Sequence, residues 1–227
     1  MKIRILMALL LQLMAISSLC SVGVAFEDIS LSAEAVGSDY FPMTKGSEWT
    51  YERKDKYPDG SVERSYYIRT VVGSFDTLTL IKELWSEDID GITYLGGVDR
   101  WYFVESGMVA MKKYSIWWSY ETPVYSNGYP LLPAIMKKGS SKTVTGKVTT
   151  DTESYAYKAT VKVEKFETLK VGAGTFKTAK IKVVFTSGAE APSTSYYWYA
   201  QGVGMIKAVT QGTNAEITRT LKRYKLK

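Results

Sequence analysis

Apolar and polar residues alternate along most of the chain, most clearly on the two sides of a glycine-rich turn. In residues 155–165 and again in 175–186, apolar side chains recur at every second position, and lysines lie between them. Gly172 and Gly174 suit a tight turn, because glycine adopts positive-φ conformations without steric cost. Alternation with a period of two is typical of a strand with one buried face. The pattern predicts two antiparallel neighbours, each with a wet, basic outer face.

Similar runs predict strands along most of the chain after residue 40. Two runs, 49–56 and 62–72, are separated by Pro58-Asp59-Gly60 and predict a hairpin. Further strands are expected near 78–85, around Ser106-Gly107, and at 143–150, 155–165, 175–186, 195–200, 205–210 and 217–226. Regular spacing of roughly a dozen short strands predicts a single all-β antiparallel domain over residues 40–227. One-face alternation favours a curved sheet, a half-barrel or an incomplete barrel over a flat sandwich.

Residues 115–133 break this rhythm with many aromatic rings and prolines. The segment predicts a long loop, and such loops are either functional lids or hydrophobic plugs. Because large rings are chiefly core material, the composition favours a plug, while a lid over a ligand stays open.

The start of the chain predicts export. Lys2 and Arg4 precede an apolar run, 5–16, and small residues follow at Gly23 and Ala25. This order is typical of a cleaved signal peptide, here 1–25, and the acidic stretch 26–39 is expected to be a mobile lead-in. An alternative is a lipid anchor at Cys20. Either route predicts a protein of the periplasm or cell envelope.

Several classes of chemistry are excluded by composition. The chain has no histidine, and its single cysteine lies within the predicted signal peptide. Histidine-dependent catalysis, histidine-ligated zinc and thiolate chemistry are therefore absent. The acidic stretch 87–91 predicts a hairpin turn rather than a calcium loop, because the later ligands are missing. We expect neither enzyme activity, nor a cofactor, nor a bound metal.

Charge is distributed unevenly between the two halves of the chain. Residues 26–135 hold 10 basic and 17 acidic side chains, net −7, while residues 136–227 hold 17 and 6, net +11. The basic half either presents solvated strand faces or contacts an anionic partner. The candidate basic surface comprises Arg219, Lys222, Arg223, Lys225 and Lys227. Export argues against a nucleic-acid partner.

Three segments resemble a known family. They are the opening Phe41-Pro42 followed by Trp49-x-Tyr51, the turn at 172–176, and the segment 197–207. Together they resemble the TapB-like family of exported bacterial β-rich proteins of unknown function. The resemblance implies an extracytoplasmic antiparallel β domain, similar to the half-barrels of periplasmic lipoprotein carriers, and says nothing about mechanism.

Two functions follow from this fold. The first is binding of a lipid, an acyl chain or another apolar ligand in a concave, ring-lined β face. The candidate lining residues are Trp49, Tyr51, Trp101, Phe103, Trp117, Trp118, Tyr120 and Trp198. The alternative is a structural or interaction protein of the envelope, which contacts anionic polymers, lipid or a protein through its basic half.

Overall fold

A computed structural model describes residues 34–89, 94–119, 121–188, 191–211 and 214–227. The predicted signal peptide, Cys20 and Tyr120 lie outside these ranges. The elements are η1 (Gly37–Tyr40), β1 (Glu48–Lys56), β2 (Val62–Phe75), β3 (Leu78–Ser86), β4 (Tyr94–Glu105), β5 (Met108–Ile116), β6 (Val124–Leu132), β7 (Ser141–Thr149), β8 (Ser154–Val171), β9 (Gly174–Ser187), β10 (Ser193–Ala200), β11 (Gly204–Gln211) and β12 (Glu216–Lys225).

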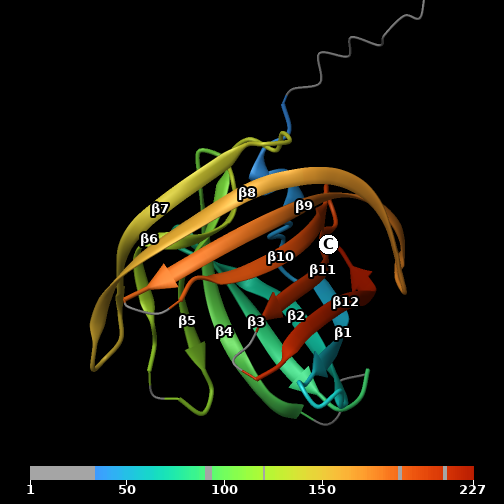
Figure 1. Ribbon diagram of the computed structural model, residues 1–227. Coiled ribbons are helices and arrows are strands. Elements are labelled where there is room, and N and C mark those ends of the chain that lie inside the picture. The colour runs from blue at the N-terminus through green and yellow to red at the C-terminus, as the bar shows by residue number, and fades with distance from the viewer. Residues whose placement is uncertain (1–33, 90–93, 120, 189–190, 212–213) are drawn as a thin grey trace, which may run out of the picture. The chain divides into compact units, whose positions relative to one another are not determined.

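The twelve strands form one closed antiparallel barrel in which each strand pairs with its neighbours in sequence (Figure 1). β1 and β12 complete the ring through a register that runs from Glu48 opposite Lys225 to Lys56 opposite Glu216. The all-β prediction is confirmed, whereas the half-barrel prediction is wrong. Closure removes the open edges of β1 and β12, because the first and last strands satisfy each other's backbone groups.

The joint between β6 and β7 has the shortest ladder of the barrel. Only Val124 opposite Thr149 and Tyr125 opposite Val148 are paired there. Aromatic side chains fill this joint: Tyr125 lies 5.4 Å from Tyr157 and 6.4 Å from Phe185, measured between ring centroids. The Tyr157 hydroxyl also donates a hydrogen bond of 2.8 Å to the Gly128 carbonyl.

β6 corrects the loop predicted over residues 115–133. Residues 124–132 form a strand that contains Pro130. Proline disrupts a strand that is paired on both sides, but it is tolerated on an edge. Pro130 fits here because β6 is unpaired with β7 beyond Tyr125.

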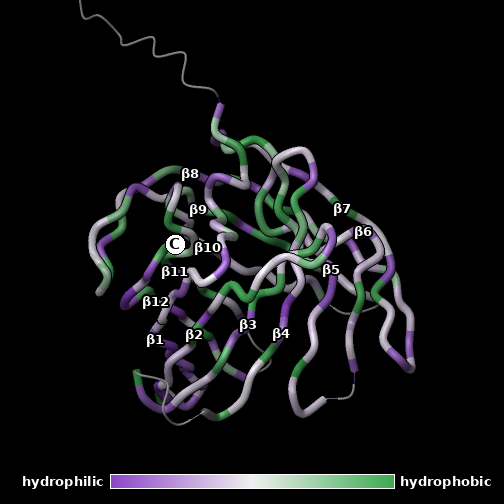
Figure 2. The backbone as a smooth tube through the Cα atoms, turned by 180° about the vertical axis from the view of Figure 1, so that it is seen from behind, coloured by the Kyte–Doolittle hydropathy of each residue, from purple (hydrophilic) through white to green (hydrophobic). Residues whose placement is uncertain are grey.

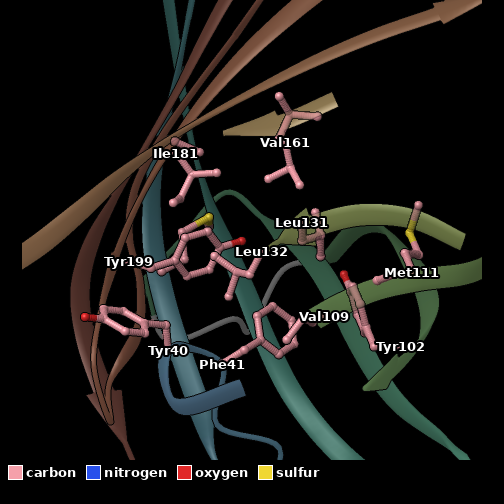
Figure 3. Packing of buried hydrophobic residues seen from close by; sticks show 14 of the residues in the cluster. Tyr40, Phe41, Tyr102, Val109, Met111, Leu131, Leu132, Val161, Ile181 and Tyr199 are labelled. Carbon is pink, nitrogen blue, oxygen red and sulfur yellow. The ribbon is translucent and has the colours of Figure 1, made fainter. Parts of the chain in front are cut away.

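The short helix η1 closes one end of the barrel. Its backbone bonds to three connections at that end: Gly37 donates to Ala134, Ser38 donates to Gly107, and Asp39 accepts from Gly202. Phe41 follows and is 4% exposed, with its ring 5.1 Å from Tyr102 (Figure 3). Residues 34–39, which belong to the expected mobile lead-in, thus form part of this barrel floor.

The apolar phase of the strands points into the barrel, as alternation predicts. In β8 and β9, Val161 lies opposite Val183 and Val163 opposite Ile181, and all four are buried. Lysines occupy the intervening outer positions. The same alternation of hydrophobic and hydrophilic positions marks most strands in Figure 2. The Gly172–Gly174 turn is also confirmed, and Gly174 has a φ of 137°.

Candidate functional site

The barrel interior contains a cavity of about 430 Å³. It is lined by Tyr67, Arg69, Glu83, Trp85, Val98, Arg100, Tyr102, Met111, Tyr114, Ile116, Tyr125, Tyr129, Leu131, Phe185, Tyr197, Tyr199, Met205 and Arg219. Figure 3 shows Tyr102, Met111, Leu131 and Tyr199 turned toward this interior. A larger hollow of about 690 Å³ lies beside Phe103 and Thr143, but none of its charged side chains is buried. The interior cavity is therefore the candidate site.

Three charged side chains from adjacent strands meet in the cavity wall. Arg69 of β2 stands opposite Glu83 of β3, and its Nε lies 3.2 Å from a Glu83 carboxylate oxygen. Arg100 of β4 donates from Nε to the other oxygen at 2.5 Å. Glu83 is 3% exposed, so this carboxylate depends on the two guanidinium groups for its stability.

The charges of this triad are fixed by their mutual proximity. Burial alone raises the pKa of Glu83, but the nearby Arg100 and Arg69 outweigh it and hold that pKa below its ordinary value. Glu83 is therefore ionised at neutral pH, and both arginines keep their protons. The triad carries a net charge of +1.

Aromatic and sulfur groups surround the two guanidinium groups. Arg69 donates to the Tyr102 hydroxyl at 3.3 Å, and its Cζ lies 5.1 Å from the Phe41 ring centroid. Arg100 lies 5.3 Å from the Tyr114 ring centroid and contacts the sulfur of Met111 at 3.4 Å. Stacking on rings stabilises cations that are removed from water.

A fourth charged residue, Arg219 of β12, lines the same cavity. Its guanidinium carbon lies 4.9 Å from the ring centroid of Tyr67. Its Nε is buried and has no hydrogen-bond acceptor among the described residues, and the same holds for Nε1 of Trp85. Tyr67 pairs with Trp85 across β2 and β3, so the two unpartnered donors flank one ring.

The tyrosines of the interior predict alkaline sensitivity. Burial raises the pKa of Tyr102 to about 12, and it also raises the pKa values of Tyr51, Tyr67, Tyr125 and Tyr199. A raised pKa contributes stability that is fully present below the unfolded value near 10 and is lost as the pH rises through the folded value. We expect cooperative unfolding above pH ~10, together with a jump in tyrosinate absorbance. Gradual tyrosine ionisation with unchanged circular dichroism would contradict buried hydroxyls.

Trp117 and Trp118 pack against opposite faces of β4 at Gly96 and Gly97. A side chain at Gly96 would collide with the Trp118 ring, and one at Gly97 would meet Trp117. Trp118 also lies 5.0 Å from Trp85, which lines the cavity, while Trp117 packs under Lys82. Trp117 is 50% exposed and Trp118 is 61% exposed, so these two rings do not plug the core, whereas Tyr125 of the same segment is buried. The pair covers glycine backbone at the barrel rim and does not fill the core.

The remaining predicted ligand-lining residues lie on two different faces. Trp49 and Tyr51 are buried and anchor β1 by hydrogen bonds to the carbonyls of Val203 (2.6 Å) and Met205 (3.0 Å). Trp101, Phe103 and Trp198 occupy the outer phase of their strands, and lysines cover two of them: Lys113 on Trp101 and Lys207 on Trp198. The structure therefore does not bring the predicted rings to one concave surface.

The candidate basic surface is also divided. Arg219 faces the interior, and Lys222 lies 3.6 Å from Glu52. Arg223 donates to the Ile89 carbonyl at 2.8 Å, and Lys225 and Lys227 are exposed.

Sequence reasoning missed the charged triad, although a signal was present. Arg69 stands between Tyr67 and Val71 in the inward phase of β2, and Glu83 stands between Ile81 and Trp85 in the inward phase of β3. A charged residue in the apolar phase of a strand indicates either a buried ion pair or a functional group.

The described residues contain no cluster of side chains suited to hold a metal ion. The same ranges include no helix of sufficient length and apolarity to cross a bilayer.

Comparison with solved structures supports the fold. The chain is similar to a protein of Bacteroides fragilis described as exported and as having a YmcC-like fold, with 14% identity, a TM-score of 0.53, and coverage of 82% of this chain and 99% of that one. It is also similar to a protein of Parabacteroides distasonis described as a lipoprotein, with 16% identity, a TM-score of 0.48, and coverage of 82% and 98%. A third match is the hypothetical lipoprotein YmcC of Escherichia coli, with 13% identity, a TM-score of 0.41, and coverage of 84% and 90%.

The match to the B. fragilis protein indicates a YmcC-like fold for this chain. No family model matches the sequence, and no curated protein is significantly similar to it. The resemblance to the TapB-like family is therefore not confirmed.

Proposed function

We propose that this chain is a non-catalytic binding protein of the cell envelope that holds an amphipathic ligand inside its barrel. One observation carries the proposal: the interior keeps a cavity of about 430 Å³ above a floor closed by η1 and Phe41. Small-molecule sites have volumes of roughly 300–1,000 Å³ and combine apolar walls with a few placed polar groups. Barrel mouths are a common place for such sites.

The lining supports an amphipathic ligand. Val98, Met111, Ile116, Leu131 and Met205 offer apolar surface. Arginines and tyrosine hydroxyls provide polar groups in the same chamber. A purely apolar ligand would leave these polar groups desolvated without compensation, which costs free energy.

Location in the envelope is supported by the predicted leader of residues 1–25. The B. fragilis protein of similar fold is described as exported. The absence of histidine supports a binding role over catalysis.

A substitution that fills the cavity tests whether the ligand binds inside the barrel. Ile116→Trp adds a large ring to the cavity wall, whereas Val104→Trp adds the same ring at an exposed position of β4. We expect the purified wild-type protein and Val104→Trp to enhance the fluorescence of a bound apolar dye, and Ile116→Trp to lose most of this signal. Equal dye binding by all three proteins at equal melting temperature would refute an interior site.

The rim tryptophans make a second prediction. Trp118→Ala should weaken dye binding several-fold, because the Trp118 ring packs against the cavity residue Trp85. Trp117→Ala, on the opposite face of β4, should leave binding unchanged. Both rings are at least half exposed, so each change should cost about 1 kcal/mol or less in urea unfolding. If Trp117→Ala weakened dye binding more than Trp118→Ala, Trp117 and not Trp118 would lie on the cavity side of β4.

A second candidate function is attachment to anionic envelope polymers. Lys162 and Lys182 stand directly opposite each other on the outer face of β8 and β9, with no acidic partner among the described residues. Like charges in direct opposition are destabilising, and an anionic partner would relieve them. Binding to anionic vesicles that weakens as salt rises would support this function.

A further inference from the structure

We propose that the barrel selects ligands with an anionic head attached to an apolar tail, and that Arg219 is the residue that meets the head. This inference rests on the proposed binding function and specifies its ligand class. Its central feature is the pairing of an uncompensated guanidinium with apolar side chains in the wall of one cavity.

The cavity has more positive than negative charge. Its charged lining residues are Arg69, Glu83, Arg100 and Arg219, which gives a net charge of +2. Glu83 is fully engaged by Arg69 and Arg100, one guanidinium at each carboxylate oxygen. No lining carboxylate is left for Arg219.

The neighbours of Arg219 on adjacent strands do not compensate it either. Arg53 stands directly opposite on β1, and Ala208 stands opposite on β11. The closest acid on that face of β1, Asp55, is already held by Arg53 through two hydrogen bonds, including one of 2.8 Å from Nε to Oδ1. Because Asp55 is taken by Arg53, neither adjacent strand supplies Arg219 with an acidic partner among the described residues.

Arg219 also has the geometry that an anionic head requires. A guanidinium offers a planar fork of donors that matches carboxylate and phosphate oxygens. The Tyr67 ring packs against the Arg219 guanidinium and restricts its freedom. Buried Nε of Arg219 and buried Nε1 of Trp85 both lack an acceptor among the described residues, and they flank Tyr67. Buried donors of this kind call for an acceptor, and an anionic head at Arg219 would supply one.

The apolar lining fits a tail. Ile116, Met111 and Leu131 come from β5 and β6 and line the same chamber as Arg219. A head held by Arg219 would thus leave the tail among apolar side chains. Free small anions would gain the charge interaction but not this burial.

The test compares three probes with one chain length. Isothermal titration of the full mature protein with dodecanoate, dodecanol and dodecyltrimethylammonium, each below its micelle concentration, measures the preference for head charge. We expect dodecanoate to bind about tenfold to a hundredfold more tightly than dodecanol, as charge-assisted hydrogen bonds imply. The cationic probe should bind most weakly. Acetate tests whether the anion alone suffices, and we expect it to bind far more weakly than dodecanoate.

Variants assign the preference to one residue. Arg219→Met should lose the advantage of dodecanoate over dodecanol, Arg219→Lys should keep part of it, and Arg64→Met, an exposed outer-face control, should behave as wild type. Melting temperatures identify a variant that fails to fold. If Arg219→Met does not fold, the preference of Arg219→Lys for dodecanoate over dodecanol tests the proposal. Equal binding of dodecanoate and dodecanol would overturn this inference but leave the binding function intact. Binding of none of the three would refute the binding function itself.

Discussion

Glu83→Gln is expected to lower the free energy of unfolding by about 3–5 kcal/mol, the range for breaking a buried ion pair on one side. Arg69 is itself buried, and Glu83 is the only carboxylate that contacts it among the described residues. Glutamine keeps the shape of glutamate but removes its charge, so two guanidinium groups would be left in the wall without compensation. Urea unfolding monitored by circular dichroism measures the loss.

Two control variants show whether the loss of stability in Glu83→Gln comes from stranding buried charges. Glu164→Gln removes an ion pair of 2.9 Å with Lys180 on the outer face, and it should cost at most about 1 kcal/mol. Adding Arg69→Met to Glu83→Gln removes one of the two stranded charges and should recover part of the loss, so the two changes should be non-additive. Equal effects of Glu83→Gln and Glu164→Gln would show that the triad contributes no more than a surface pair.

The triad also sets the acid response. Because the pKa of Glu83 is held below its ordinary value, its contribution is present above about pH 4.5 and is lost as the pH falls through the folded value. Stability of the wild-type protein should therefore decline in acid more steeply than that of Glu83→Gln.

Local alternation was enough to predict most strands. The segments 155–165 and 175–186 appear within β8 and β9, and 195–200 and 205–210 within β10 and β11. The side-chain pattern reports only which face of a strand is buried. Closure depends on the pairing of β1 with β12, which are separated by most of the chain, and no local pattern encodes it. β6 was missed because prolines and rings mask a strand that lies mainly on an edge.

The candidate site was harder to predict than the fold. The ligand-lining residues were chosen because they are aromatic, without regard to which face of its strand each one occupies. Tyr102 faces the cavity, so its neighbours Trp101 and Phe103 must face outward. The same rule places Trp198 outside, next to Tyr199. Arg219 was assigned to the surface as part of a basic run, although it shares the inward phase with buried Leu221. Strict attention to phase would have identified the inward charges, but not the contacts that they make.

Phe41→Ala is the second change expected to have a large effect, because this ring closes the barrel floor. Its centroid lies 5.1 Å from that of Tyr102 and 6.2 Å from that of Tyr199, and the Arg69 guanidinium packs on it. Truncation of a buried phenylalanine costs about 3–5 kcal/mol, since the surrounding residues relax only partly into the space. That is a large share of the 5–15 kcal/mol that is typical of folded domains.

Phe75→Ala is the matched control, because Phe75 ends β2 and is 57% exposed. Its loss should change the free energy of unfolding by no more than about 0.5 kcal/mol. The urea midpoint of Phe41→Ala should therefore fall well below both parent and control. The same variant should also bind dye differently, because the space left by the ring adjoins Tyr102, Tyr199 and Arg69 at the base of the cavity. A midpoint equal to that of Phe75→Ala would mean that η1 and Phe41 rest on a barrel that is already closed without them.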